Sequence, residues 1–125
     1  MDKTIQNIIK QTRKDKAVIA VAFFGSYARA EPHRDIDVCI FLKPAEYTPE
    51  FLSSKKFEYT QEDERYDVQL FQQLPLYIQK RILKEAKIVD CKNEDLLYDL
   101  YFLTLRDFGH YEHIYEGYLE AVESG

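Results

Sequence analysis

Glycine is scarce in this chain of 125 residues. Within the first hundred positions it occurs once, at Gly25, directly before Ser26. A residue without a Cβ permits a tight turn and the close approach of a ligand to the backbone. Because the rest of this stretch does without glycine, Gly25 marks a turn that needs one.

Cysteine pairs and an excess of basic charge are also lacking. Cys39 and Cys91 show no CxxC spacing, so we expect two small core residues and no disulfide framework. The histidines are not spaced to form a metal site with these cysteines; they are His33, His110 and His113. The net charge of −5 argues against a general nucleic-acid binder, which would usually be basic.

Long apolar runs are absent as well. No segment approaches the length that spans a bilayer, and no signal-peptide pattern opens the chain. We therefore expect no membrane association and a cytoplasmic location. The length is close to that of an ordinary domain, which predicts one domain over residues 1–125.

The residues before the glycine predict a strand. Residues 17–24 are uninterrupted apolar, which is typical of a strand buried on both faces. Gly25 ends this strand, and Ser26 is suited to cap a helix that follows it. Unpaired N–H groups at such a helix start attract phosphate. The nearby cations that could assist are Arg29, Arg34 and Lys43.

Two aspartates lie at the start of the next predicted strand, residues 36–42. Strand alternation puts Asp35 and Asp37 on one face, roughly 7 Å apart at the backbone. Two such carboxylates repel each other unless one is protonated or a cation lies between them. Oxygen ligands with room for water favour a hard ion such as Mg²⁺. The plainer alternative is a pair of solvated residues at a strand start.

A third carboxylate, Asp67, interrupts the predicted strand over residues 65–71. If this strand pairs with residues 36–42, Asp67 lies next to the other two aspartates. Three carboxylates suit a pair of metal ions that serve a phosphoryl displacement. We favour Asp67 because a carboxylate within a strand is unusual unless it has a functional role. The competing acids look like a solvated charge run in a loop: Glu62, Asp63 and Glu64.

The remaining elements are mostly helical. We expect an amphipathic helix over residues 2–14, breaks at Pro44 and Pro49, a helix from Pro75 to residue 86 and a short edge strand over 87–90. Residues 51–64 are hard to interpret, either a loop or a short element over the site. A helix capped by Asn93 runs to about residue 122 and is apolar on more than one face. The excess apolar surface indicates deeper core or contact with another protein.

Taken together, Gly25-Ser26, Arg29, Asp35-Ile36-Asp37 and Asp67 resemble the signature of the minimal nucleotidyltransferases of the DNA polymerase beta superfamily. Residues 74–85 and the long closing helix are similar to MNT antitoxin subunits that pair with HEPN toxins. The resemblance implies an α/β (α+β) fold, a small mixed sheet flanked by helices. The spacer over residues 27–34 is slightly shorter than is typical, and Ala30 stands where glycine is common.

The resemblance also implies a function. Nucleotide would be bound by Gly25, Ser26 and Arg29, and the catalytic aspartates would hold two Mg²⁺ ions. AMP would pass from ATP to a tyrosine of a cognate HEPN toxin, a ribonuclease, and silence it. Two alternatives stay open, an antitoxin that acts by contact alone and a nucleotidyltransferase that modifies a small molecule. Further domains of the kind that small-substrate enzymes use are not expected in a chain of this length.

Overall fold

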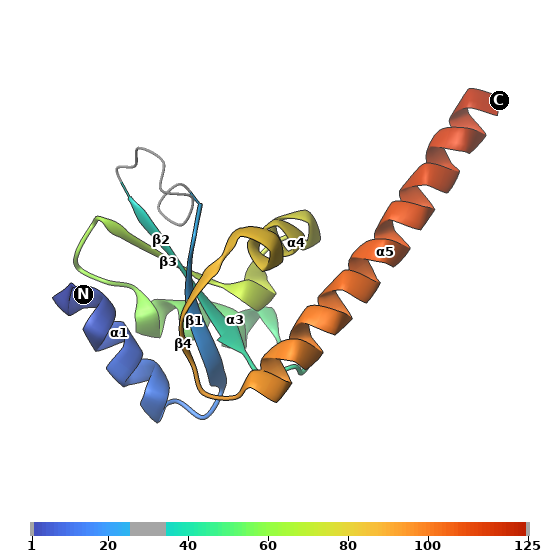
Figure 1. Ribbon diagram of the computed structural model, residues 1–125. Helices are drawn as coiled ribbons and strands as arrows, with labels where there is room; N and C mark the ends of the chain where they lie inside the picture. The colour runs from blue at the N-terminus through green and yellow to red at the C-terminus, as the bar shows by residue number, and fades with distance from the viewer. Residues whose placement is uncertain (1, 26–34, 125) are drawn as a thin grey trace.

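The computed structural model describes residues 2–25 and 35–124, with side chains described as far as residue 109. The helices are α1 (Lys3–Lys14), α3 (Pro49–Tyr59), α4 (Leu76–Glu85) and α5 (Glu94–Ser124), with a 3₁₀ turn η1 (Phe71–Gln73) (Figure 1). The strands are β1 (Val18–Phe24), β2 (Ile36–Leu42), β3 (Tyr66–Leu70) and β4 (Lys87–Cys91). The helix predicted from Ser26 lies outside the described residues.

These strands form one mixed sheet in the order β3-β2-β1-β4. β1 runs antiparallel to both β2 and β4, whereas β2 and β3 run parallel. The small mixed sheet and the edge position of β4 are therefore as predicted. The carboxyl end of β1 and the amino ends of β2 and β3 meet at one end of this sheet.

Helices cover both faces of the sheet (Figure 1). On one face α1 and α3 bury Ile8 and Tyr59 against Val38 and its neighbours. On the other face α4 and α5 contribute Ile82 and Leu100, which pack with Phe41 and the buried thiol of Cys39. Successive residues of β2 thus alternate between two apolar cores, as the strand period requires.

Helix α3 begins at Pro49, where a break in regular structure was predicted. It also covers most of residues 51–64, for which the sequence predicted either a loop or a short element. Proline is tolerated in the first turn of a helix, and the Thr48 hydroxyl accepts a hydrogen bond from the Phe51 N–H at 3.1 Å. Periodicity could not reveal this helix because its apolar residues do not keep to one side. Tyr59 is fully buried, whereas the side chain of Phe57 is 82% exposed.

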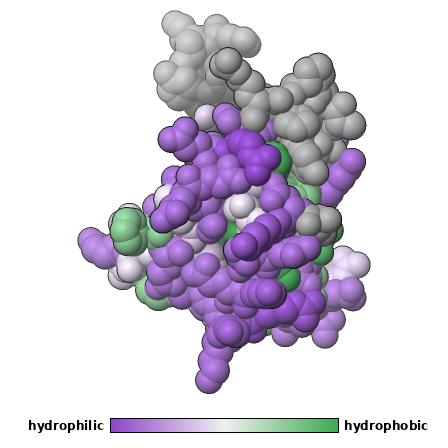
Figure 2. Space-filling view, turned by 90° about the vertical axis from the view of Figure 1, so that its left-hand side faces the viewer, coloured by the Kyte–Doolittle hydropathy of each residue, from purple (hydrophilic) through white to green (hydrophobic). Residues whose placement is uncertain are grey.

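The last helix carries apolar residues on two sides. Its start is capped as predicted, since the Leu96 N–H donates to Asn93 Oδ1 at 3.1 Å. Leu100 and Thr104 are buried against the domain. The carboxyl-terminal part of α5 projects away from the sheet (Figure 1). Within the described part of the chain, no helix combines the length and apolarity that a membrane crossing needs. The view from the α1 side is largely hydrophilic (Figure 2).

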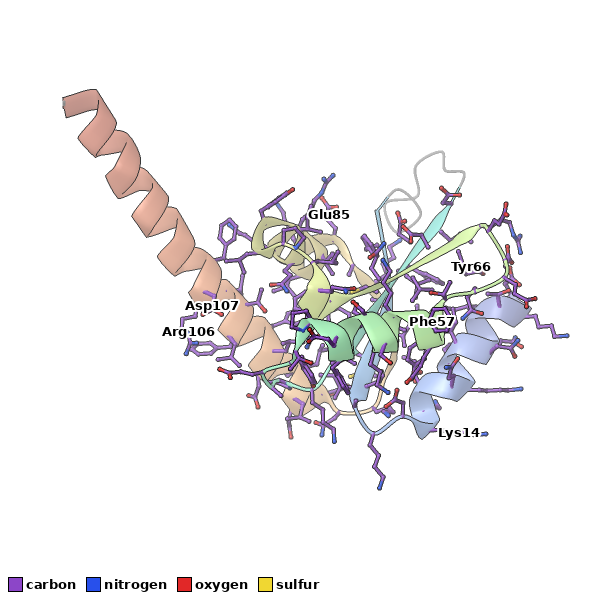
Figure 3. The ribbon with its side chains drawn as sticks, turned by 180° about the vertical axis from the view of Figure 1, so that it is seen from behind. Lys14, Phe57, Tyr66, Glu85, Arg106 and Asp107 are labelled. Atoms are coloured by element: carbon purple, nitrogen blue, oxygen red, sulfur yellow. The ribbon has the colours of Figure 1, made fainter. Side chains whose placement is uncertain are left out.

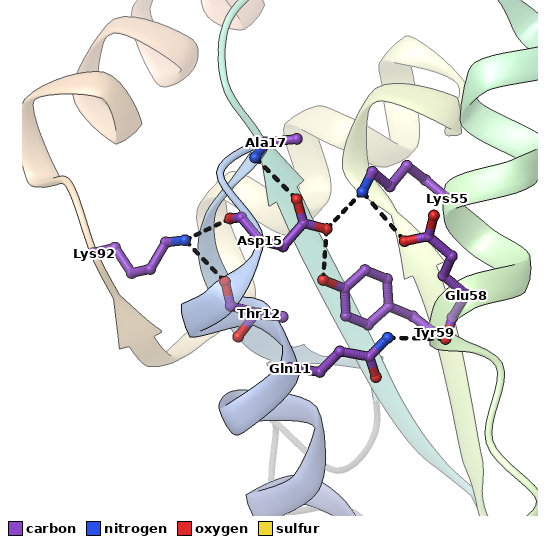
Figure 4. Close-up of polar contacts among 8 residues, drawn as sticks. All are labelled: Gln11, Thr12, Asp15, Ala17, Lys55, Glu58, Tyr59 and Lys92. Carbon is purple, nitrogen blue, oxygen red and sulfur yellow. Dashed lines mark hydrogen bonds and ion pairs between the residues drawn. The ribbon is translucent and has the colours of Figure 1, made fainter.

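A polar cluster around Asp15 joins α1, β1 and α3 (Figure 4). The Oδ2 atom of Asp15 accepts hydrogen bonds of 2.7 Å from both Lys55 Nζ and the Tyr59 hydroxyl. The Oδ1 atom of Asp15 accepts one from the Ala17 N–H. Burial opposes the charge of Asp15, but these donors outweigh it and lower the pKa of the carboxyl. The same burial and the Asp15 charge raise the pKa of Tyr59.

We predict that Asp15→Asn lowers the free energy of unfolding at pH 7 by about 2 kcal/mol, because Lys55 loses its charged acceptor. The folded pKa of Asp15 lies below its unfolded value, so its contribution is present above the unfolded pKa and is lost as the pH falls through the folded pKa. Urea unfolding of parent and variant at pH 7 and near pH 3 measures the difference in their free energies of unfolding. The difference between parent and variant should shrink at the lower pH, and an unchanged difference would contradict the assignment.

Candidate active site

Two of the predicted site residues lie in one row across the sheet, and a third, Gly25, directly follows the strand residue that completes this row. In the β1–β2 ladder Phe24, the residue before Gly25, pairs with Asp37. In the parallel β2–β3 ladder Asp37 pairs with Asp67. Paired residues project to the same face, and neighbouring strands are about 4.8 Å apart. The predicted pairing of the two strands is confirmed, and it brings the turn and two of the aspartates together.

Gly25 is required at this position for two independent reasons. Its φ of +71° lies in the left-handed region, which residues with side chains rarely adopt. A Cβ built on Gly25 would also collide with the carboxylate of Asp37, whose Oδ2 is its nearest neighbour. The missing side chain therefore makes room for the aspartate of the adjacent strand.

The aspartates differ in their surroundings. Asp35 is exposed just before β2, whereas Asp37 is half-buried within it. Asp67 is exposed, and its Oδ1 accepts a hydrogen bond of 3.0 Å from Gln69 Nε2. The amide oxygen of Gln69 in turn accepts from Lys56 Nζ at 3.1 Å. Positive charge from α3 thus reaches the edge strand on which Asp67 lies.

The predicted metal site of Asp35, Asp37 and Asp67 stays a prediction. Among residues whose side chains are described, no three acidic, histidine or cysteine side chains form a group that could hold a metal ion. Asp67 is engaged by Gln69, and like charges keep ionised carboxylates apart. The donor set still fits a hard cation, because the aligned Asp37 and Asp67 offer oxygen atoms only.

The competing acids have other partners or stay in solvent. Asp63 accepts hydrogen bonds from Arg65 at 2.7 Å and from the Thr4 hydroxyl at 3.2 Å, which ties it to α1. The side-chain and backbone donors of Arg65 lower the pKa of Asp63 to about 2. Glu62 and Glu64 are exposed in the same loop. This arrangement favours Asp67 as the third acid, whose role stays a prediction.

The predicted cations are placed differently from the acids. Ser26, Arg29 and Arg34 lie outside the described residues. Lys43 was assigned wrongly, because it follows the far end of β2, where its N–H donates to the Ala17 carbonyl at 2.9 Å. Sequence reasoning instead missed Arg81 of α4, which lines a cavity of about 310 Å³ together with Gly25 and Asp37.

Comparison with known proteins agrees with this geometry. A family model described as "Polymerase beta, Nucleotidyltransferase" matches residues 6–95, which include Gly25 and all three aspartates. The chain is 31% identical over 74 residues to MJ1547 of Methanocaldococcus jannaschii, whose name proposes a protein adenylyltransferase. This match covers 58% of the chain and 55% of the relative, so the chain spans about half of that protein's length.

Solved structures share the fold at low sequence identity. One, a toxin–antitoxin with AMP-PNP, contains a chain that matches with a TM-score of 0.63 at 15% identity, covering 95% of each chain. Another, a tri-AMPylated Shewanella oneidensis HEPN toxin in complex with an MNT antitoxin, matches with a TM-score of 0.63 at 16% identity and 95% coverage of each. These likenesses establish the fold, including the mixed sheet and the long last helix.

We predict that Gly25→Ala lowers the free energy of unfolding by about 1–2 kcal/mol, through left-handed strain and displacement of Asp37. Gly109→Ala is the matched control, because a Cβ there meets nothing within 4 Å and the residue lies in α5. That variant should be more stable than the parent by up to about 1 kcal/mol. Urea unfolding distinguishes the two, and effects of the same sign would contradict the role given to Gly25.

Proposed function

Because the chain belongs to the polymerase beta nucleotidyltransferase family, we propose that it transfers AMP from ATP to a tyrosine of a HEPN toxin and thereby acts as the antitoxin. The row that places Gly25 beside Asp37, and Asp37 beside Asp67, carries this proposal. A turn without a side chain next to paired carboxylates suits a polyphosphate and its counter-ions better than it suits a purely structural strand end.

The transfer replaces one phosphorus–oxygen bond with another. The tyrosine hydroxyl oxygen bonds to the α-phosphorus of ATP, the bond from that phosphorus to the β-phosphate oxygen breaks, and pyrophosphate leaves. Asp67 accepts the hydroxyl proton on its carboxylate, which is exposed at the edge of the sheet and therefore accessible to a protein side chain. Gly25, Ser26 and Arg29 bind the triphosphate.

Metal binding is part of the same proposal. Asp35, Asp37 and Asp67 are the residues that would hold two Mg²⁺ ions, since carboxylate oxygens are the ligands this cation prefers. Bound Mg²⁺ would offset the charge of the triphosphate and polarise its phosphoryl oxygens. In this role Asp37, half-buried against the turn, fixes the position of the phosphates relative to the exposed Asp67.

An exposed apolar stripe on α5 supports a protein as the acceptor. Tyr98, Phe102 and Leu105 are spaced i, i+4 and i+7, so they share one side of the helix, and they are 73%, 68% and 50% exposed. Beside them Ile88 and Tyr98 line a groove of about 310 Å³ between β4 and α5. Aromatic residues of this kind are enriched at protein interfaces. The stripe by itself would also serve the alternative, an antitoxin that acts by contact alone.

The aspartates provide the test of catalysis. Asp37→Asn and Asp67→Asn should each reduce AMP transfer about 100-fold or more, because each removes a charge that the chemistry uses. We expect Asp67→Asn to retain ATP binding. The intact mass of a candidate HEPN toxin, recorded after incubation with Mg²⁺ and ATP, measures transfer. Asp63→Asn, a change in the competing loop, is the control and should transfer normally. Normal transfer by Asp67→Asn would refute its role.

The partner surface is tested separately from the chemistry. Replacing Tyr98 and Phe102 with serine should weaken toxin binding at least about tenfold, because exposed aromatic anchors carry much of the energy of an interface. Phe57→Ser is the control, since this phenylalanine is even more exposed than Tyr98 and Phe102 and lies on α3, away from α5 (Figure 3). Calorimetric titration with the toxin measures both. Equal losses in the two variants would contradict a docking role for α5.

A further inference from the structure

A cavity lies between the carboxyl end of β1 and helix α4. It has a volume of about 310 Å³ and is lined by Phe24, Gly25, Asp37, Ile78, Arg81, Ile82 and Glu85. Two of these residues, Gly25 and Asp37, are predicted site residues, and four come from α4. Helix α4 therefore forms the wall that faces the Gly25 turn, although no charged residue of α4 was expected to contribute to the site.

Arg81 is the cation of this cavity among the residues that the structure describes. Its Nε lies 3.5 Å from Glu85 Oε2, one helical turn further along α4, and the two side chains are 60% and 28% exposed. An i,i+4 pair on a helix whose guanidinium is exposed contributes little stability. The guanidinium can therefore exchange this carboxylate for a stronger anion at small cost.

Other arginines of the described chain are held more closely. Arg65 lies 2.7 Å from Asp63 and 3.0 Å from Asp2, and Arg13 lies 2.6 Å from Asp90. The contacts with Asp2 and Asp90 join α1 and its cap to the rest of the domain, and the contact with Asp63 lies within one loop, so a ligand is not needed to explain them. The longer contact of Arg81 has no such structural purpose, since both partners lie on the same helix.

Arg81 is the described group of this cavity that attracts an anion. Asp37 and Glu85 also line the cavity and repel an anion, so a polyphosphate there needs Arg81 together with the cation that the proposed function places at Asp37. The planar fork of arginine donates paired hydrogen bonds that match phosphate oxygens. The rest of the described lining is apolar, apart from Gly25: Phe24, Ile78 and Ile82.

We propose that Arg81 binds the polyphosphate of the nucleotide that the Gly25 turn receives, and that Glu85 holds the guanidinium toward the cavity until the nucleotide arrives. The inference rests on the proposed function and adds a substrate-binding residue on α4. Phosphate replaces Glu85 as the partner of Arg81, and no bond other than hydrogen bonds changes. Removing Glu85 therefore strengthens phosphate binding, whereas removing Arg81 weakens it.

Calorimetric titration of the full chain with ATP and with inorganic tripolyphosphate, each with Mg²⁺, tests the assignment. Arg81→Gln should bind both ligands about tenfold or more weakly, because a charge-assisted contact is lost. Arg81→Lys keeps the charge and should lose less. Glu85→Gln should bind both ligands severalfold more tightly. Arg106→Gln is the control, because this exposed arginine also pairs with an acid of its own helix, Asp107 of α5, away from Glu85 (Figure 3).

The outcomes separate the inference from the proposed function. Parent-like affinity of Arg81→Gln for both ligands, or a loss confined to ATP, would overturn the assignment to the polyphosphate. Tripolyphosphate binding that depends on Arg81, in a protein that transfers no AMP to a HEPN toxin, would overturn the proposed function and support the phosphate site. Thermal unfolding of each variant confirms that the exposed substitutions leave the fold intact, and a parent that binds neither ligand would refute both.

Discussion

The close approach of Gly25 and Asp37 is the constraint on which the rest of the site depends. A side chain at position 25 would occupy the space of the Asp37 carboxylate, and the left-handed φ of Gly25 would strain it further. Phe24 pairs with Asp37, and Asp37 pairs with Asp67. The register of these two strand ladders therefore fixes the position of both aspartates relative to Gly25. A slip of one residue in either ladder would turn an aspartate to the opposite face.

The core preserves that register. Val38 and Ile40 of β2 face α1 and α3, whereas Cys39 and Phe41 face α4 and α5. The two faces of β2 are thus buried beyond Asp37, so the aspartate sits where the strand leaves the core. Burial also raises the pKa of the Cys39 thiol, which keeps it neutral beneath the site.

Sequence patterns were sufficient where the information is local. A carboxylate inside a predicted strand singled out Asp67, and the parallel ladder places Asp67 beside Asp37. Sequence patterns did not predict which cations lie near the site, because residues close in the chain can lie far apart in space and distant ones can lie close together. Lys43 is near Asp37 in sequence, yet six strand residues carry it roughly 20 Å away. Arg81 is remote in sequence and gives the local signal of an ordinary i,i+4 ion pair, so nothing in the pattern connects it with Gly25.

The three-carboxylate group shows a different limit. Spacing can place acidic residues on adjacent strands, but it cannot say which hydrogen bonds their side chains prefer. Asp67 accepts from Gln69, a residue two positions along the same strand, and this local bond competes with any arrangement that draws the acids together. The binding of a cation must therefore outweigh both this hydrogen bond and the repulsion between carboxylates.

Helix α4 connects the site with the surface proposed for a protein partner. Its Arg81 and Ile82 line the cavity at Gly25, while Ile82 also packs in the core that includes Leu100 of α5, and Lys80 lies 4.0 Å from the ring centre of Phe108. A protein that docks on Tyr98 and Phe102, as proposed, would lie on α5, which packs against a helix of ten residues, about 15 Å long, that also lines the cavity at Gly25. A small-molecule acceptor would make no use of the exposed stripe on α5, whereas a protein acceptor would bind to it. This difference is the structural reason for proposing a protein as the substrate.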